Sequence, residues 1–327
     1  MGEFELLARL RERLPPPGPR LRVGMGDDAA VSLPGGAVAT SVDAIVDGVH
    51  FRRERATPAQ IGHKALATAL SDLAAMGAEP GEAYVTLGVP PDLDEEACLE
   101  LLDGLLALAG RTGTSLAGGD VTRSGELFLA TTVVGHAATP EQLVTRAGAR
   151  PGDALVLTGE AGGAAAGLLT LERPEAAAAI PPSMTERLRA RQLEPQPRLA
   201  AGRALAKAGA TAMIDLSDGL GGDAAHLAEA SGVRLAIDAD AIPLAAGVPQ
   251  VAAATGSDLW SLALAGGEDY ELLAALPAGR LGEATAAVDE AEAVSLTRIG
   301  EVEAGEGVEI RPRGGEPIEP KGFDQLA

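Results

Sequence analysis

The chain has 327 residues, of which 46% are hydrophobic and 22% are charged, and its formal net charge is −21 at pH 7. This composition is typical of a globular protein that is long enough for two domains, and it argues against intrinsic disorder. The excess of acidic residues disfavours nucleic acids and anionic membranes as partners.

The chain begins with a predicted amphipathic helix over residues 4–14, which ends at Pro15. Its early acidic residues are unlike a signal peptide, and no apolar run reaches the roughly 18 residues of a membrane helix. We therefore expect a cytoplasmic protein. Alternating apolar and polar residues with β-branched side chains then predict a strand over residues 36–46.

The next helix is predicted from Pro58 to about Gly77, because Thr57 and Gln60 have the spacing of a capping box. A strand over residues 82–89 and a helix over 94–110 follow, and further strands are predicted from residue 114 and over 126–137. The only cysteine, Cys98, lies in the predicted helix over 94–110. A lone cysteine excludes an internal disulfide and a thiolate metal cage, and we expect a buried, unreactive thiol.

The polar, turn-rich segment at residues 146–153 is the predicted domain boundary, which gives domains of residues 1–147 and 148–327. The second domain is expected to contain strands over 153–159, 211–216 and 234–238, with helical segments over 161–169, 174–197 and 198–209. The stretch LWSLALAGGEDYELLAAL (residues 259–276) predicts a strand, a glycine turn and a second strand. Alternating strands and helices predict a mixed α/β, or α+β, chain in two lobes.

Small acidic motifs recur along the chain, several of them where a predicted strand gives way to a turn. They are GMGDD (24–28), SVD (41–43), SD (71–72), GGD (118–120), DLSDG (215–219) and GGED (266–269). Glycine permits close approach of the backbone to a ligand, and carboxylates without Cys or clustered His favour Mg²⁺ or Ca²⁺. Aspartates that converged on one cleft would take up protons or collect cations, as multi-magnesium phosphoryl-transfer sites do. Each motif alone is more often a turn or a helix cap than a ligand site, and it is their number at element junctions that favours a site.

Other phosphate-binding and catalytic motifs are missing from the sequence. There is no GxxxxGK[ST] loop, no GxSxG elbow and no HExxH. TGEAGGAAAG (residues 158–167) is similar to a dinucleotide-binding loop, but close packing of a strand on a helix is the better explanation of its glycines.

Seven motifs together closely resemble the thiamine-monophosphate kinases. In chain order they are VGMGDDAAV, SVDAIVDGVHF, KALATALSDLAAMGAEP, LAGGDVT, RAGARPGD, IDLSDGLGGD and LAGGEDYEL, and the similarity extends from about Glu3 to the C-terminal KGFDQL. The resemblance implies the two-lobed fold shared with aminoimidazole ribonucleotide synthetase, with an N-terminal lobe that forms a dimeric β-barrel and a C-terminal mixed α/β lobe. It implies ATP-dependent phosphorylation of thiamine monophosphate to thiamine diphosphate, by direct in-line transfer of the γ-phosphate in a site with several Mg²⁺ ions.

The resemblance also assigns roles to matching positions. The magnesium ligands would be Asp28, Ser41, Val42 (through its carbonyl), Asp43, Asp72, Asp120, Asp215 and Asp218, with Asp43, Asp72 and Asp120 at the catalytic centre. ATP would contact Gly119, Asp120, Arg146 and Ser217, and thiamine phosphate would contact His50, Glu268 and Phe323. Two departures are notable: Val42 replaces a common threonine, and Thr112 stands where an adenine-side tyrosine is frequent.

Two alternatives stay open on the sequence. One is another ATP-using enzyme of the same fold, such as an aminoimidazole ribonucleotide synthetase, which would release free phosphate. The other is a non-catalytic protein that binds divalent cations structurally, although the chain lacks the DxDxDG spacing of an EF-hand.

Overall fold

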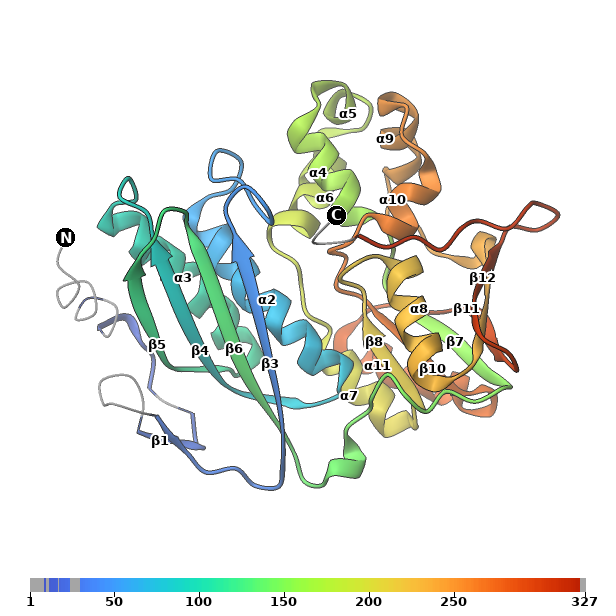
Figure 1. Ribbon diagram of the computed structural model, residues 1–327, viewed down its shortest axis with the longest axis horizontal. Helices are drawn as coiled ribbons and strands as arrows, with labels where there is room; N and C mark the ends of the chain where they lie inside the picture. The colour runs from blue at the N-terminus through green and yellow to red at the C-terminus, as the bar shows by residue number, and fades with distance from the viewer. Residues whose placement is uncertain (1–8, 10–11, 17, 24–29, 324–327) are drawn as a thin grey trace. The chain divides into compact units, whose positions relative to one another are not determined.

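The computed structural model describes residues 9, 12–16, 18–23 and 30–323. The predicted helix over residues 4–14 therefore lies largely outside the described residues, and Asp28 lies wholly outside them. The chain divides into two compact units: unit 1 comprises residues 1–73 and 78–140, and unit 2 comprises residues 74–77 and 141–327 (Figure 1). The domain boundary after residue 147 stays a prediction. Within the described residues, no helix combines the length and apolar character of a membrane span.

Unit 1 contains a four-stranded sheet whose strand order is β3-β6-β4-β5. The strands are β3 (Ala37–Val46), β4 (Glu79–Val89), β5 (Ser115–Arg123) and β6 (Phe128–Ala137), and a short pair, β1 (Leu21–Val23) and β2 (Val31–Ser32), forms a separate ribbon. Strand β6 is antiparallel to both neighbours, whereas β4 and β5 are parallel. Strands β3 and β5 are therefore the two edges of this sheet.

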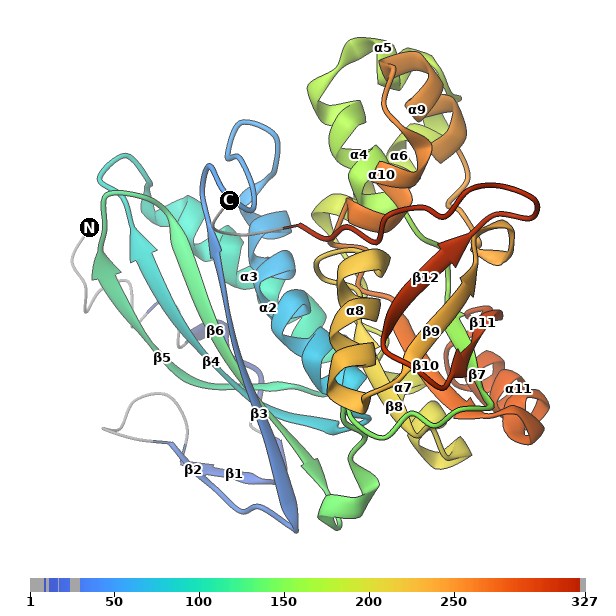
Figure 2. The same cartoon turned by 45° about the vertical axis from the view of Figure 1, so that its right-hand side comes forward.

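Two helices, α2 (Pro58–Ala75) and α3 (Glu95–Thr112), lie on one face of the sheet (Figure 2). The predicted capping box at the start of α2 is present: the Thr57 N–H donates to Gln60 Oε1 at 3.1 Å, and the Gln60 N–H donates to Thr57 Oγ1 at 3.2 Å. Asp94 caps α3 by accepting from the Ala97 N–H at 2.8 Å. Cys98 is buried in α3, as predicted, and burial raises its thiol pKa to about 11.

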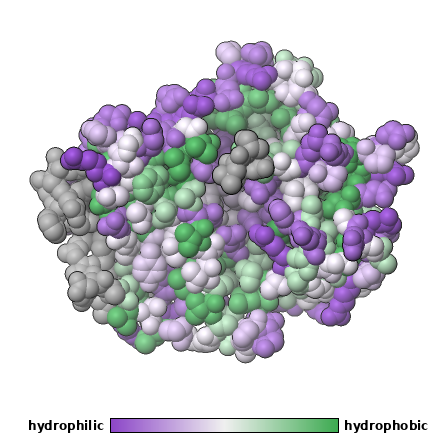
Figure 3. All heavy atoms as spheres, in the orientation of Figure 1, coloured by the Kyte–Doolittle hydropathy of each residue, from purple (hydrophilic) through white to green (hydrophobic). Residues whose placement is uncertain are grey.

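The opposite face of this sheet is covered by no helix of the described residues. It presents small and apolar side chains from three strands: Val38, Thr40, Val42 and Ala44 on β3, Ala130 and Thr132 on β6, and Tyr84 and Thr86 on β4. Val38 and Val42 are 45% and 65% exposed. In the space-filling view, hydrophobic surface lies along the position of β3 (Figure 3). We call this surface the open sheet face.

Unit 2 is built on a six-stranded sheet with the order β12-β9-β11-β7-β10-β8. Its strands are β7 (Asp153–Thr158), β8 (Ala212–Asp215), β9 (Arg234–Asp238), β10 (Leu272–Pro277), β11 (Leu296–Glu303) and β12 (Gly307–Arg311). Its helices are α4 (Gly163–Glu172), α5 (Pro174–Ala178), α6 (Pro182–Leu193), α7 (Leu199–Ala208), α8 (Leu220–Ser231), α9 (Val248–Thr255), α10 (Leu259–Ala265) and α11 (Leu281–Glu292). Three short 3₁₀ turns occupy Pro140–Gln142, Ala239–Ala241 and Ala278–Arg280.

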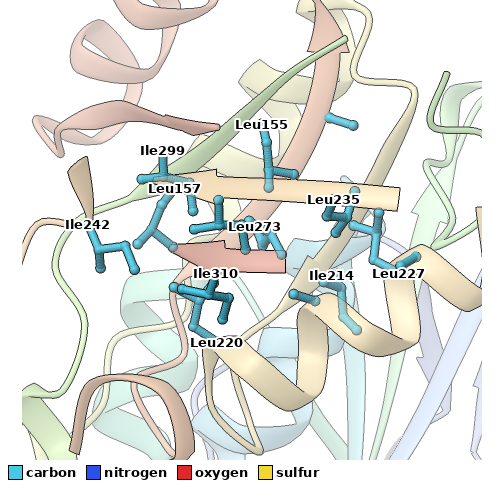
Figure 4. Packing of buried hydrophobic residues seen from close by; sticks show 14 of the residues in the cluster. Leu155, Leu157, Ile214, Leu220, Leu227, Leu235, Ile242, Leu273, Ile299 and Ile310 are labelled. Atoms are coloured by element: carbon cyan, nitrogen blue, oxygen red, sulfur yellow. The ribbon is translucent and has the colours of Figure 1, made fainter. Parts of the chain in front are cut away.

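The core of unit 2 lies between this sheet and α8. Leu155, Leu157 and Leu273 on the central strands are fully buried and pack with Leu220 and Leu227 of α8 (Figure 4). A second, smaller apolar cluster joins α4, α6 and α9. The two-lobed α/β architecture that the sequence predicts is thus observed.

One predicted strand is wrong. Residues 259–265 form helix α10, because Asp258 accepts the Ser261 N–H at 2.8 Å and caps the helix. Seven residues, six of them apolar, are too few for periodicity to distinguish a buried helix from a strand. The second strand of that prediction, β10, is present.

Candidate functional site

In unit 1, the SVD and SD motifs meet between β3 and α2. Ser41 and Asp43 are two residues apart on β3, so their side chains share the face that packs on the helices. The Ser41 hydroxyl donates to a carboxylate oxygen of Asp72, which lies on α2. Burial, reinforced by the charge of Asp72, raises the pKa of Asp43 to about 6. Three of the predicted site residues therefore form one cluster, in which two acids lie close enough to repel each other.

The described residues contain no group of three or more His, Cys, Asp or Glu side chains positioned to hold a metal ion. The residues present nevertheless fit Mg²⁺ carried by a phosphate ligand. Magnesium keeps several waters and usually takes only one or two carboxylates plus phosphate oxygens. The oxygens of Ser41, Asp43 and Asp72 could serve as such ligands, and a cation would offset both the burial and the repulsion from Asp72 that raise the pKa of Asp43.

The end of β3 explains how Val42 and His50 are oriented. The Val46 N–H donates to His50 Nδ1 at 3.1 Å, and the Val46 carbonyl accepts from the His50 N–H at 3.0 Å, so neither group of Val46 pairs with β6. Since backbone groups alternate in direction along a strand, the Val42 carbonyl also points to the free edge of β3. The Val42 side chain itself lies on the open sheet face, so only its carbonyl could act as a ligand.

The GGD motif lies on the other edge strand, β5, and is not brought to Asp43 within one chain. The cross-strand register aligns Asp120 with Thr86, Ala130 and Ala44, on the face opposite to Asp43. Three strand spacings of about 4.8 Å separate β5 from β3, or about 14 Å. Close packing also favours glycine at position 119, because a Cβ there would lie 2.0 Å from the Val85 carbonyl oxygen.

In unit 2, three aspartates gather where β8 leads into α8. Asp215 ends β8, and the Asp218 N–H donates to a carboxylate oxygen of Asp223 at 3.1 Å. Burial, then the charges of Asp215 and Asp218, raise the pKa of Asp223 to about 8 against the opposing influence of Arg146. Asp223 is a candidate that the sequence analysis missed. The only sequence feature that could have indicated it is the GLGGD motif (219–223), which is typical of an ordinary helix start.

Three predicted residues, Ser217, Glu268 and Phe323, lie beside these aspartates. The Glu268 N–H donates to the Ser217 carbonyl at 2.9 Å, and the Phe323 N–H donates to the Asp218 carbonyl at 2.8 Å. The C-terminal segment reaches this position because α8 begins with two glycines: a Cβ on Gly222 would lie 2.8 Å from the Gly322 Cα. Phe323 is 56% exposed, so its ring is available to a ligand.

The GGED motif forms a turn between α10 and β10 that buried contacts hold in place. The Asp269 carboxylate accepts the Gly162 and Ala164 N–H groups at 2.6 and 3.0 Å, at the start of α4. The N-terminus of α4 therefore binds a side chain of this protein, and the glycines of TGEAGGAAAG serve helix packing. Burial raises the pKa of Asp269 to about 6, although Arg191 and the two N–H groups oppose the shift.

Thr112, where the resemblance departs from the family, is the last residue of α3. Its hydroxyl donates to the Leu108 carbonyl and contacts Thr114 Oγ1 at 2.8 Å, so it serves the end of α3. The structure therefore gives this position no aromatic ring for a base to stack on.

Comparisons with known proteins match both halves of the chain. Residues 26–137 match the family model described as AIR synthase related protein, N-terminal domain, and residues 150–312 match the corresponding C-terminal domain. A relative from Mycobacterium tuberculosis (strain CDC 1551 / Oshkosh), named thiamine-monophosphate kinase, is 39% identical over 288 residues, covering 85% of this chain and 83% of its own length.

Solved structures agree with these matches. A thiamine-monophosphate kinase from Stenotrophomonas maltophilia K279a superposes with a TM-score of 0.80 and 36% identity, over 94% of each chain. A structure described as "AaThiL complexed with AMPPCP and TMP" superposes with a TM-score of 0.76 and 32% identity, over 88% of this chain and 86% of its own.

Proposed function

The chain belongs to the thiamine-monophosphate kinase family, and on this premise we propose that it phosphorylates thiamine monophosphate to thiamine diphosphate with ATP. The observation that carries the proposal is the likeness to AaThiL in complex with AMPPCP, an ATP analogue, and TMP. The acidic clusters of each unit and the anchored turn at residues 266–271 support it. Their residue types suit phosphate-bound cations and a substrate with a cationic ring.

In unit 1, we assign Asp28, Ser41, the Val42 carbonyl, Asp43 and Asp72 as magnesium ligands. When bound, Mg²⁺ would screen the phosphate charges that otherwise oppose the transfer. The chain's own part is to hold these oxygens in place, and the hydrogen bond from Ser41 to Asp72 fixes one carboxylate against β3. His50, whose ring is oriented by the Val46 N–H, is assigned to the substrate phosphate.

In unit 2, we assign Asp215 and Asp218 to magnesium, and Ser217 and Arg146 to ATP. The charge of Arg146 already acts on the Asp223 carboxyl, so this arginine lies in the same electrostatic environment as the aspartates. Its planar guanidinium suits phosphate oxygens. Glu268 and Phe323 are assigned to the organic part of the substrate, with the exposed ring of Phe323 facing the thiazolium cation.

The reaction needs no covalent nucleophile from the protein. The terminal oxygen of the substrate phosphate is already anionic, so it attacks the γ-phosphorus in line while ADP leaves. Alignment and charge screening supply the catalysis, rather than a general base.

We further propose a homodimer that buries the open sheet face. This face carries exposed valines, which a second copy could cover. The edge strands of its sheet, β3 and β5, could form hydrogen bonds with strands of that copy. In a two-fold arrangement with β5 of one copy beside β3 of the other, Asp120 would lie one strand spacing, instead of three, from a β3 strand that carries Asp43 and the Val42 carbonyl. One chain alone keeps them on opposite edges and opposite faces of its sheet.

Complementation tests this arrangement. Asp43→Asn and Asp120→Asn should each be inactive, and co-refolding the two should restore about a quarter of wild-type activity, because half of the dimers are mixed and one of their two sites is intact. If the co-refolded mixture shows no activity although light scattering shows a dimer, both residues act within one chain. A monomer at micromolar concentration would refute the dimer itself.

The function is tested by incubation with ATP, Mg²⁺ and thiamine monophosphate, followed by chromatography. Formation of thiamine diphosphate is the expected result. If no diphosphate forms but a formylglycinamidine substrate releases free phosphate from ATP, the alternative enzyme of the same fold is supported. If ATP is untouched with either substrate, the chain is a cation-binding protein.

A further inference from the structure

The turn at residues 266–271 adopts a backbone that only strong anchoring can maintain. Glu268 and Tyr270 have φ values of 61° and 50°, in the left-handed region that non-glycine residues seldom occupy. Two backbone hydrogen bonds of 2.9 Å tie the N–H groups of these residues to the carbonyls of Ser217 and Leu216. The position of the Glu268 backbone is therefore fixed against the Asp215–Asp218 loop.

The carboxylates of this turn have different kinds of partner. Fully buried Glu271 accepts from Arg198 through two 2.7 Å bonds and from Arg191 at 3.1 Å. Asp269 accepts two backbone N–H groups. The partners of Glu268 include an uncharged side chain, which donates a hydrogen bond to its carboxylate.

That side chain is Gln192, which lies on α6 next to Arg191. Its Nε2 donates to Glu268 Oε2 at 2.5 Å, and Gln192 is only 5% exposed. A buried amide has few alternative partners, so it holds the glutamate in one rotamer. Because the amide is neutral, this hydrogen bond orients the carboxylate without placing a positive charge beside it, which an arginine at this position would do.

We propose that Gln192 is a positioning residue that presents the charged Glu268 carboxylate to the nitrogen-bearing organic part of the substrate. This inference rests on the proposed function, and it concerns affinity for thiamine phosphate rather than for ATP. Helix α6 thus holds the turn twice, through Arg191 to Glu271 and through Gln192 to Glu268.

The test compares Gln192→Met, which keeps the size but removes the donor, with Gln196→Met. Gln196 follows α6 and is exposed, and its amide donates to the Glu194 carbonyl, away from the turn. Gln192→Met should raise the KM for thiamine phosphate about tenfold, as expected for one hydrogen bond to a charged group. The KM for ATP should change less than twofold, and Gln196→Met should change neither.

A double-mutant cycle shows whether Gln192 acts through Glu268. Glu268→Gln alone should raise the KM for thiamine phosphate, and adding Gln192→Met should then raise it less than about threefold further. If the two effects multiply, or if both KM values rise together, Gln192 has only a structural role and the inference fails. Should Gln192→Met fail to fold, the isosteric Gln192→Glu replaces it and should raise the same KM at least as much, because it sets an acid against Glu268.

The outcomes separate this inference from the function on which it rests. A wild-type protein that makes no thiamine diphosphate overturns both. An active wild type with an unchanged KM for thiamine phosphate in Gln192→Met overturns the inference and leaves the kinase proposal intact.

Discussion

Replacing Asp223 with asparagine should remove a large part of the pH dependence of unit 2 stability. Burial and the neighbouring acids raise the pKa of this carboxyl from 3.8 to about 8, so the folded protein keeps a proton there that the unfolded chain loses near pH 4. Between these values the folded state binds the extra proton, and the free energy of unfolding falls by about 1.4 kcal/mol per pH unit as the pH rises. From pH 5 to pH 7, this residue therefore costs about 2.7 kcal/mol.

The assay is urea unfolding without Mg²⁺ or nucleotide, at pH 5, 6 and 7. Trp260, the only tryptophan, packs against the core of unit 2, so its fluorescence reports on that unit. The wild type should lose stability over this range, and Asp223→Asn should lose about 2.7 kcal/mol less. Asp289→Asn, an exposed change on α11, is the matched control. If wild type and Asp223→Asn lose the same free energy between pH 5 and pH 7, the reasoning about this buried acid is refuted.

Three further predictions concern other parts of the molecule. Asp72→Asn should lower kcat by about 100-fold or more with an unchanged circular dichroism spectrum; activity within twofold of wild type would remove the unit 1 cluster from the mechanism. Glu271→Gln should lower the free energy of unfolding by about 3–5 kcal/mol, because it removes the fully buried charge that pairs with the partly buried Arg198 and Arg191, whereas Glu301→Gln, in an exposed pair, should cost less than about 1 kcal/mol. Phe323→Ala should raise the KM for thiamine phosphate roughly 2- to 30-fold, as loss of a cation–π contact predicts, with the KM for ATP unchanged; equal changes in both would exclude that role.

Several local features of the structure could be predicted from the sequence. The capping box at Thr57 and Gln60 and the burial of Cys98 are examples, and the SVD and SD motifs proved to share one cluster. The first two follow from short-range contacts and helix periodicity, whereas the third joins residues 31 positions apart and depends on the packing of β3 against α2.

Features that depend on the order of strands or on long-range packing could not be predicted from the sequence. The separation of Asp120 from Asp43 follows from the strand order β3-β6-β4-β5, which no local pattern specifies. Asp223 gained its significance from burial beside two other aspartates, not from its motif. The contact between Gln192 and Glu268 joins residues 76 positions apart. The magnesium ligands, the dimer and the cytoplasmic location stay predictions.

The most direct test of the central claim is to follow the γ-phosphate of ATP. With labelled ATP, Mg²⁺ and thiamine monophosphate, the label should appear in thiamine diphosphate, with one ADP formed for each diphosphate. Label that appears only as free inorganic phosphate, or that stays in ATP, would contradict the claim that this chain transfers the phosphoryl group directly between its two substrates.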